Sequence, residues 1–175
     1  MRKLTMEELN RLDVPTFKEV PKNNFVLILD SIRSLHNVGS IFRSADAFLA
    51  QKIYLCGITG TPPHREIQKT ALGATESVQW QYEKDALTTI KQLKQEGYLI
   101  VALEQADQSQ DLAHYHFDKN QKYAFILGNE MFGIDEQLIT QVDVCLEIPQ
   151  FGTKHSLNVA VSTGILLWDY FLKTQ

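Results

Sequence analysis

Five short apolar runs, separated by segments of helical periodicity, constrain the fold of this chain more than any other feature. The runs do not alternate polar and apolar residues, which is typical of strands covered on both faces of a sheet. The segments between them repeat apolar residues at helical spacing, as Ile41, Ala45 and Phe48 do. This alternation predicts a single α/β domain with a mostly parallel sheet and helices on both faces. The predicted strands cover residues 25–29, 53–56, 98–103, 123–127 and 142–148.

Helix boundaries also show in the sequence. Asp85 is a suitable N-cap residue, and Gly97 suits the position just beyond a helix C-terminus. A loop gives way to Ser156 and Asn158 where a long amphipathic segment starts, so free backbone N–H groups are expected at that helix start. The predicted helices of the domain cover residues 38–49, 85–96, 134–140 and 158–172.

Residues 1–24 are expected to form an arm in front of the domain, which covers residues 25–175. Thr5 and Glu8 have the spacing of a capping box, which predicts a short helix over residues 6–12. Packing on the core and contact with RNA or a second copy are open roles for the arm. The rest of the arm is expected to stay extended because it holds two prolines, Pro15 and Pro21.

The composition is that of an ordinary soluble domain, with 44% hydrophobic and 22% charged residues. No apolar run approaches the roughly 20 residues that a membrane span needs, and residues 1–8 lack the apolar core of a signal peptide. Cys56 and Cys145 lie in apolar runs and are expected to be buried thiols. We therefore expect a cytoplasmic protein without membrane contact.

The net charge of −4 argues against a nucleic-acid partner, but the charge is unevenly distributed. Residues 31–72 carry five lysines or arginines against two acids, whereas residues 73–150 carry five against thirteen. A local basic region of this size suits a protein that binds RNA and releases it again. An evenly solvated surface with accidental clustering remains the alternative.

Three polar segments have the composition of a site, namely residues 37–45, 127–133 and 148–158. The last two begin where predicted strands end, and Glu104 directly follows a third strand. Ligands of open α/β sheets bind at the carboxyl ends of the strands, so a small-molecule pocket is expected there. The chain has no Gly-x-Gly-x-x-Gly after its first strand and no Walker motif, which argues against a dinucleotide or triphosphate site of the common types.

In this order, the three segments resemble the motifs of the SpoU (TrmH-like) family of RNA ribose 2′-O-methyltransferases, in the SPOUT superfamily. The likeness extends over residues 25–172. Gln150 stands where the family often has Met, and His155 where an acid often precedes the serine; neither position carries chemistry in the family. The motifs are Asn37-x-Gly39-x-x-x-Arg43-x-Ala45, Gly128-x-Glu130-x-x-Gly133, and Ile148-Pro149 through Gly152 to Ser156-Leu157-Asn158-Val159.

The resemblance implies S-adenosylmethionine as methyl donor, a homodimer, and a deep trefoil knot around residues 127–161. It implies 2′-O-methylation of a ribose in structured RNA, with tRNA favoured. A ribosomal RNA target, or a catalytically silent RNA-binding protein of the same fold, are the alternatives.

The resemblance also assigns residues to roles. Those implied in catalysis are Arg43, Asn37, Glu130, Ser156 and Asn158. Those implied in donor binding are Leu103, Glu104, Leu127, Gly128, Asn129, Ile148, Gln150, Gly152, Ser156 and Leu157. The candidates for RNA contact are Arg33, His36, Arg43, Lys154, His155, and the pair His64 and Arg65 in an expected loop.

Arg43 has the central role in the family, sometimes as the group that activates the ribose hydroxyl. A guanidinium stays protonated at ordinary pH, so it is a poor base. Binding an RNA phosphate, with that phosphate or water accepting the proton, is a more economical role; a surface salt bridge is the alternative. Asn37, Ser156 and Asn158 are open to helix capping as well as to a role in the site, and Glu130 is expected to organise the motif loops.

Other readings are weaker. A hydrolase built on Ser156 and His155 lacks a Gly-x-Ser-x-Gly elbow, and adjacent residues rarely present their side chains to each other. The five histidines have no ligand spacing typical of a metal site, so no metal is expected.

Overall fold

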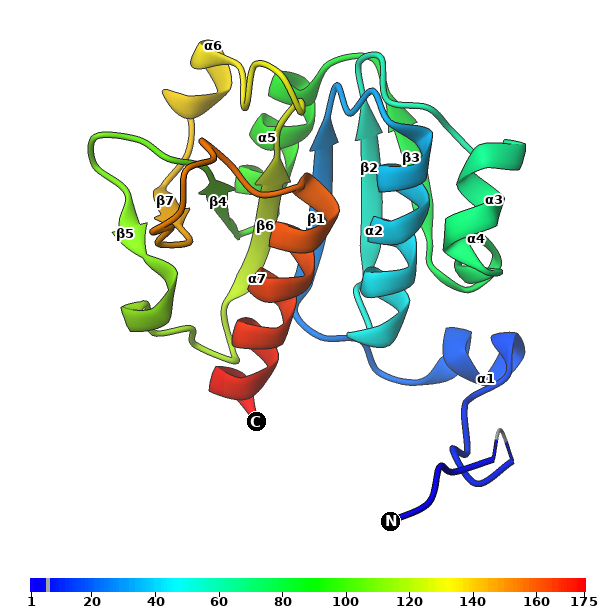
Figure 1. Cartoon of the computed structure of the whole chain (residues 1–175). Coiled ribbons are helices and arrows are strands. Elements are labelled where there is room, and N and C mark those ends of the chain that lie inside the picture. The colour runs from blue at the N-terminus through cyan, green and yellow to red at the C-terminus, as the bar shows by residue number, and fades with distance from the viewer. Residues whose placement is uncertain (6) are drawn as a thin grey trace.

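The computed structural model describes residues 1–5 and 7–175 and contains a seven-stranded sheet in which all paired strands are parallel (Figure 1). The strand order is β3-β2-β1-β6-β4-β7-β5, so β6 and β7 each lie between strands that precede them in the chain. The strands are β1 Phe25–Asp30, β2 Lys52–Cys56, β3 Trp80–Glu83, β4 Tyr98–Leu103, β5 Gln110–Asp111, β6 Lys122–Leu127 and β7 Val144–Glu147.

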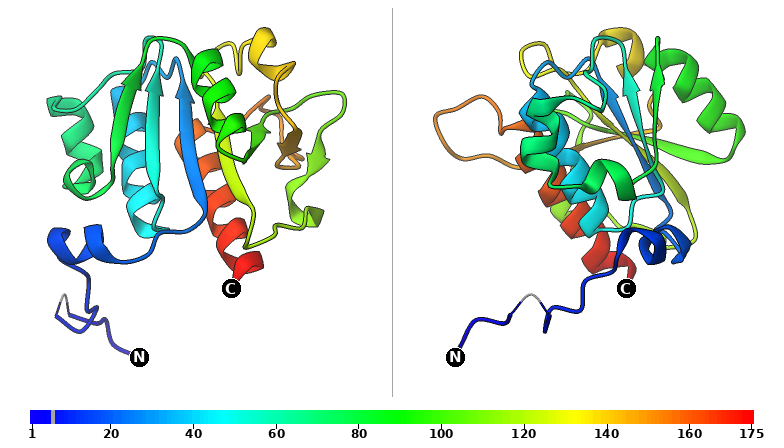
Figure 2. Two further views of the ribbon diagram at one scale, coloured as in Figure 1. Left: turned by 180° about the vertical axis from the view of Figure 1, so that it is seen from behind. Right: turned by 90° about the vertical axis from the view of Figure 1, so that its right-hand side faces the viewer.

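Helices cover both faces of the sheet, as predicted. Helices α2 and α7 lie side by side on one face, whereas α5 lies on the other (Figures 1 and 2). Among the described residues, no helix is long and apolar enough to cross a membrane. The helices are α1 Val14–Glu19, α2 Leu35–Ala47, α3 Arg65–Ala71, α4 Ala74–Ser77, α5 Ala86–Gln95, α6 Glu136–Ile139 and α7 Val159–Thr174, with a 3₁₀ turn at Leu112–His114.

Strand β1 explains why the apolar runs are continuous. All six of its residues are buried, and successive side chains enter different cores. Leu27 packs in the cluster under α2 and α7, whereas its neighbour Ile28 packs in the cluster under α5 and α6. A strand at the centre of a doubly covered sheet therefore needs an apolar residue at every position.

The elements missed by the sequence analysis lie at the periphery. Strand β3 is an edge strand whose central residues, Gln81 and Tyr82, are exposed, and β5 has two residues. Neither produces an apolar run. Helix α3 buries Ile67 and Ala71 only, too little for a clear helical period. Strand β7 is shorter than residues 142–148, because the residues at both ends of that range are loop.

The predicted helix over residues 6–12 is wrong in the described part of that range, which begins at residue 7. The capping-box bonds do form, with Glu8 Oε2 accepting from Thr5 N at 2.8 Å and Thr5 Oγ1 accepting from Glu8 N at 3.3 Å. They close a single turn, after which Asn10 takes a positive φ of 46°. The arm is not extended at Pro15 either, because this residue lies in the first turn of α1, where a missing N–H costs no hydrogen bond.

Candidate active site

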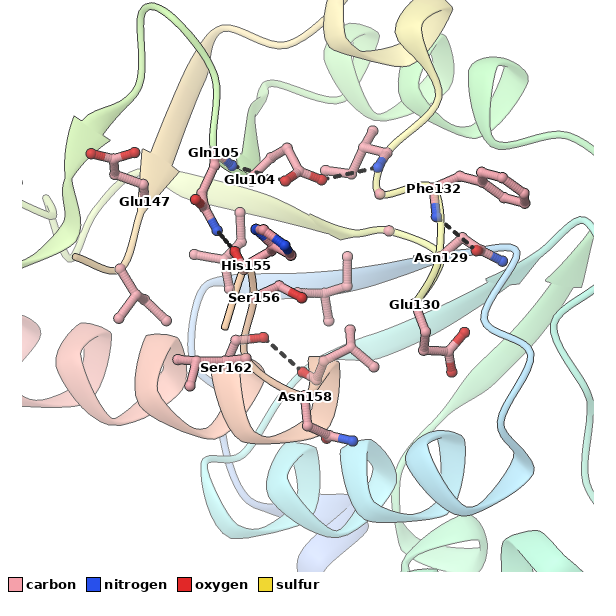
Figure 3. Close-up of a pocket in the computed structure, with 18 of the residues that line it drawn as sticks. Glu104, Gln105, Asn129, Glu130, Phe132, Glu147, His155, Ser156, Asn158 and Ser162 are labelled. Atoms are coloured by element: carbon pink, nitrogen blue, oxygen red, sulfur yellow. Dashed lines mark hydrogen bonds between the residues drawn. The ribbon is translucent and has the colours of Figure 1, made fainter. Parts of the chain in front are cut away.

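A cavity of about 710 Å³ opens where the loops after β4, β6 and β7 meet the start of α7 (Figure 3). It lies at the carboxyl edge of the sheet, and its volume is in the range of small-molecule sites. The lining includes Leu103 and Glu104 at the end of β4, Leu127 through Ile134 from the end of β6 onward, and Ile148, Gln150 and His155 through Val159 after β7.

The charge and polarity of the lining restrict the ligand. Three carboxylates line the cavity, those of Glu104, Glu130 and Glu147, and none of the lining residues is a lysine or arginine. Leucine and isoleucine side chains from all three loops supply apolar walls. Such a cavity suits a ligand that combines a flat apolar part with a positive charge.

The loop after β6 is held tightly in shape. Backbone bonds join Asn129 and Gly133 in both directions, at 3.0 and 2.9 Å. The Asn129 Oδ1 accepts from Met131 N at 2.9 Å and from Phe132 N at 3.2 Å. A Cβ added to Gly128 would lie 2.4 Å from the backbone carbon of Gly133, so this glycine is required for the close approach.

Glu130 joins the first and second motifs at the mouth of this cavity. Its carboxylate accepts from the backbone N–H groups of Arg33 and Ser34, both at 2.9 Å, and from Asn37 Nδ2 at 2.9 Å. The Oδ1 of Asn37 in turn accepts from Asn158 Nδ2 at 3.0 Å. One continuous chain of hydrogen bonds thus connects all three motifs, although Asn37 of the first is 93 and 121 residues from its partners in the other two.

The same contacts determine the protonation of Glu130. Partial burial raises the pKa of its carboxyl, but the N–H donors of Arg33, Ser34 and Asn37 together outweigh that effect and hold the pKa below the ordinary value of 4.5. Glu130 is therefore a carboxylate at neutral pH and acts as an acceptor for the motif loops.

Asn158 has a second role as the N-cap of α7. Its Oδ1 accepts from Ala160 N at 2.9 Å and from Val161 N at 3.3 Å, while its amide nitrogen contacts Asn37. Capping and site organisation are therefore performed by the same side chain. Ser156 lines the cavity two residues earlier and makes no capping bond to α7.

A model of the "SpoU rRNA Methylase family" matches residues 24–168, which include the sheet, the cavity and most of α7. The chain belongs to the SpoU family. This membership explains why the three motifs converge on one hydrogen-bonded chain although they are distant in sequence.

Relatives of this SpoU chain methylate guanosine riboses, according to their names. A tRNA (guanosine(18)-2′-O)-methyltransferase of Mus musculus is 34% identical over 85% of this chain and 9% of its own length. A 23S rRNA (guanosine-2′-O-)-methyltransferase of Neisseria meningitidis is 34% identical over 81% of this chain and 56% of its own. The chain thus spans about half of one relative and a small part of the other.

Solved structures of the family have the same fold. The AdoMet-bound rRNA methyltransferase of Sinorhizobium meliloti superposes with a TM-score of 0.79 at 27% identity, over 88% of this chain and 59% of that one. The TrmH/SpoU tRNA modifying enzyme of A. aeolicus superposes at 0.81 with 22% identity, over 91% and 80% of the two chains, a likeness of fold.

The residues expected to bind the donor lie together, with one exception. Nine of the ten line the cavity. Gly152 does not: it lies in the exposed loop before α7, and a Cβ added there would meet nothing within 4 Å. Several lining residues are not among those expected to bind the donor: Gln105, Ala106, Met131, Phe132 and Glu147. Each lies close to the end of a strand or beside a motif position, and this place in the sequence could have identified them.

Arg43 lies outside the cavity. It is exposed on α2, two turns beyond His36 on the same side of the helix. In the described part of the chain the Arg43 side chain forms no ion pair. The position leaves the guanidinium available to a group outside this chain.

The other basic candidates divide among three places. His36 Nε2 lies 2.8 Å from Glu66 Oε2, beside the pair that Glu66 forms with Lys69. His64 is the loop residue that caps α3, its Nδ1 accepting from Glu66 N at 3.1 Å, whereas Arg65 is the first residue of the helix and not in a loop. Lys154 and His155 lie in the exposed loop before α7, where Gln105 Nε2 donates to the His155 carbonyl at 2.8 Å, and Arg33 lies across the motif-two loop.

Proposed function

We propose that this chain transfers a methyl group from S-adenosylmethionine to a ribose 2′-hydroxyl of structured RNA, with tRNA favoured over ribosomal RNA. The observation that carries the proposal is the bonded chain Glu130–Asn37–Asn158 at the mouth of the 710 Å³ cavity. It places polar groups of all three motifs beside a pocket of donor size. The relatives named for guanosine 2′-O-methylation support the reaction class.

The cavity fits the donor by charge and by shape. Glu104, Glu130 and Glu147 give the lining a negative charge, and the apolar walls accept an adenine ring. When bound, the donor supplies an electrophilic methyl carbon on a positively charged sulfur. The residues that would hold it are those of the three loops, with Gly128 keeping the loop after β6 close to the pocket.

The residues of this chain would position the ribose and its phosphate. Asn37 and Asn158 fix each other and present amide groups at the cavity mouth, and Ser156 lines the same wall. Arg43 binds a phosphate, because its guanidinium stays charged; the proton of the hydroxyl passes to phosphate or water. Orientation of the hydroxyl beside the donor is the main contribution of such a site.

We further propose a homodimer in which Arg43 serves the cavity of the partner. Helix α7 exposes an apolar stripe and packs beside α2, the helix that carries Arg43, and a second copy would cover the stripe. The stripe comprises Val161, Ile165, Trp168 and Leu172, with exposed fractions of 52%, 38%, 50% and 55%.

Mixing two impaired variants, assayed at a donor concentration too low to saturate Gly128→Ala, tests this arrangement. Arg43→Ala and Gly128→Ala, refolded together in equal amounts, should recover about a quarter of the wild-type rate, because each mixed dimer holds one intact site. A site confined to one protomer would give no recovery. Light scattering on the wild-type protein gives the oligomeric state independently.

The trefoil knot around residues 127–161, the arm at residues 1–24 and the domain at 25–175 are part of the same proposal. The insertion of β6 between β1 and β4, and of β7 between β4 and β5, supports a knotted path, since the late chain must pass between strands already joined by earlier connections. An RNA substrate places the protein in the cytoplasm.

Donor binding is the first experiment. Calorimetry with S-adenosylmethionine should show saturable heat, and incubation with tritiated donor should label bulk tRNA at the 2′-position. Absence of donor heat would favour a silent RNA-binding protein. Mapping 2′-O-methyl nucleotides in tRNA and ribosomal RNA from a deletion strain against its parent then identifies the target; a site lost from ribosomal RNA alone would overturn the preference for tRNA.

A further inference from the structure

A second cavity, of about 590 Å³, lies on the other side of the motif-two loop from the donor cavity. It is formed above the carboxyl ends of β1, β2 and β3 and reaches the start of α5. Asn129, Phe132 and Gly133 line both cavities. None of the motif residues expected to act in catalysis lines this second space, so the proposed methyl transfer leaves it without a role.

Two exposed apolar side chains border this cavity. Ile58, in the loop after β2, is 70% exposed, and Phe132, in the motif-two loop, is 81% exposed. Apolar side chains from two separate loops beside an open cavity provide a surface on which a flat ring can stack.

Charged groups of both signs lie in the same cavity. The side chains of Arg33 and Lys84 line it and form no ion pair with any residue among 1–5 and 7–175. Asp30, at the end of β1, is 9% exposed, and its Oδ1 accepts from Ser31 Oγ at 3.2 Å. Burial raises the pKa of the Asp30 carboxyl above its ordinary value, and hydrogen bonds from the Asp135 backbone and from Ser31 offset this effect only in part. A ligand that donates further hydrogen bonds to the carboxylate would replace the remaining lost solvation.

A metal ion is a poor fit to this cavity. Asp85 and Asp135 also line it, but their carboxylates accept from backbone N–H groups of helix starts, Asp85 from Leu87 N and Asp135 from Gln137 N. No three ligand-type side chains come together as a metal site in the described residues.

We propose that this second cavity receives a nucleobase of the substrate RNA, and that guanine fits it best. The inference rests on the proposed function, because it assigns the cavity to the same RNA. The base stacks on Phe132 and Ile58, as bases do on apolar and aromatic surfaces of RNA-binding proteins. The Asp30 carboxylate, which only accepts, pairs with the adjacent N1–H and N2–H donors that guanine alone presents. Arg33 and Lys84 are positioned for the flanking phosphates.

Hydrogen bonds link the second cavity to the loop that lines the donor cavity, so a base bound there would be coupled to the site of methyl transfer. Asn129 Nδ2 donates to the Ser31 carbonyl at 2.7 Å, and Arg33 N donates to Glu130 Oε2 at 2.9 Å. The floor of the second cavity is therefore bonded to the loop that lines the donor cavity. A base extruded from the RNA and seated here brings its strand to the mouth of the donor site, as enzymes that act on structured nucleic acids require.

Mononucleotide titration tests the site directly. Calorimetry is performed with saturating S-adenosylhomocysteine, which occupies the donor cavity and prevents nucleotides from entering it. GMP should bind at least about tenfold more tightly than AMP, and IMP, which lacks the 2-amino group, should fall between them. Equal affinities for GMP and AMP would overturn the proposal.

Two variants separate recognition from folding. Asp30→Asn replaces an acceptor-only group by one that accepts and donates, so the preference should shift from GMP toward AMP by about tenfold; a loss of stability alone would lower both affinities together. Ile58→Ala should weaken GMP by about fivefold, while Leu72→Ala, at an apolar residue 65% exposed and outside the cavity, should change nothing. Unchanged GMP affinity in Ile58→Ala would contradict the stacking surface.

A third experiment distinguishes binding of a base within RNA from binding of a free guanine nucleotide. GMP should compete with bulk tRNA in filter binding, and Ile58→Ala should weaken tRNA binding while leaving the affinity for S-adenosylhomocysteine unchanged. GMP binding without competition would assign the cavity to a free nucleotide and overturn the RNA proposal. If S-adenosylhomocysteine itself gave no heat, the proposed methyl transfer would fail, and titration of GMP without it would still decide what the second cavity binds.

Discussion

The two cavities beside the motif-two loop differ in charge although they share a wall. The donor cavity is lined by three glutamates and by no lysine or arginine, whereas the second cavity has charges of both signs and two exposed apolar side chains. Its charged residues are Arg33, Lys84, Asp30, Asp85 and Asp135. A five-residue loop, Asn129 to Gly133, separates a space suited to a cation from a space suited to a nucleotide. Residues of the second and third family motifs line the first cavity, whereas Gly133 alone of the motif positions lines the second.

The largest expected effect leaves both cavities intact. Arg43→Ala should lower methyl transfer about 10²–10³-fold, because a charge that acts on the reacting nucleotide is lost, while the affinities for S-adenosylhomocysteine and GMP stay at wild-type values. Tritium incorporation into bulk tRNA measures the first, and calorimetry the second. Lys91→Ala, at an exposed lysine on α5 across the sheet, is the control. Full activity of Arg43→Ala would exclude the proposed role.

A smaller effect should be confined to the donor cavity. Gly128→Ala forces a Cβ to within 2.4 Å of the Gly133 backbone, so the loop must move and donor affinity should fall at least about tenfold. Gly152→Ala is the matched control, since its Cβ meets nothing within 4 Å. Equal losses in the two variants, measured by calorimetry, would mean that the loop before α7 closes over the donor.

Acid should weaken the hydrogen bonds that the Glu130 carboxylate accepts between the two cavities. Its pKa is lowered in the folded protein, so its stabilising effect is complete above the ordinary value of 4.5 and is lost as the pH falls through the lower folded value. Glu130→Gln should melt at a lower temperature than wild type at pH 7, by a few degrees, and the difference should vanish in stronger acid. Glu136→Gln, on the exposed start of α6, should melt like wild type at both pH values. A difference that is independent of pH would contradict a role for the charge.

The smallest effect compares two thiols, one near each cavity. Burial raises the pKa of Cys56, next to the loop of Ile58, to about 12, and it raises the pKa of the half-buried Cys145 as well. At pH 8 a disulfide reagent should therefore modify Cys145 slowly and Cys56 only on unfolding. The donor product should slow Cys145 further, because its Sγ lies 3.5 Å from the Glu104 carbonyl. Faster reaction of Cys56 in the folded protein would contradict the packing of β2.

The central sheet could be predicted because its strands are apolar at every position, as Phe25 through Leu29 are. The edge strand β3 could not, because residues such as Gln81 face solvent. The motif residues identified the donor cavity, but not how they are joined: the bonds from Arg33 and Ser34 to Glu130 are between residues 97 and 96 positions apart, and they use backbone N–H groups that carry no side-chain signal. The second cavity was missed because Ile58 and Lys84 are isolated in the sequence and meet only in the fold.

The position of β6 between β1 and β4 has a consequence for how the protein is made. Its neighbours β1 and β4 are both synthesised before it. A nascent chain that ends near residue 111 therefore has two strand edges with no strand between them. The loop from Gly128 to Gly133 cannot form until β6 pairs with β1 and β4. A chain that terminates before β6 therefore lacks both binding spaces at once, because residues of that loop line the two cavities together.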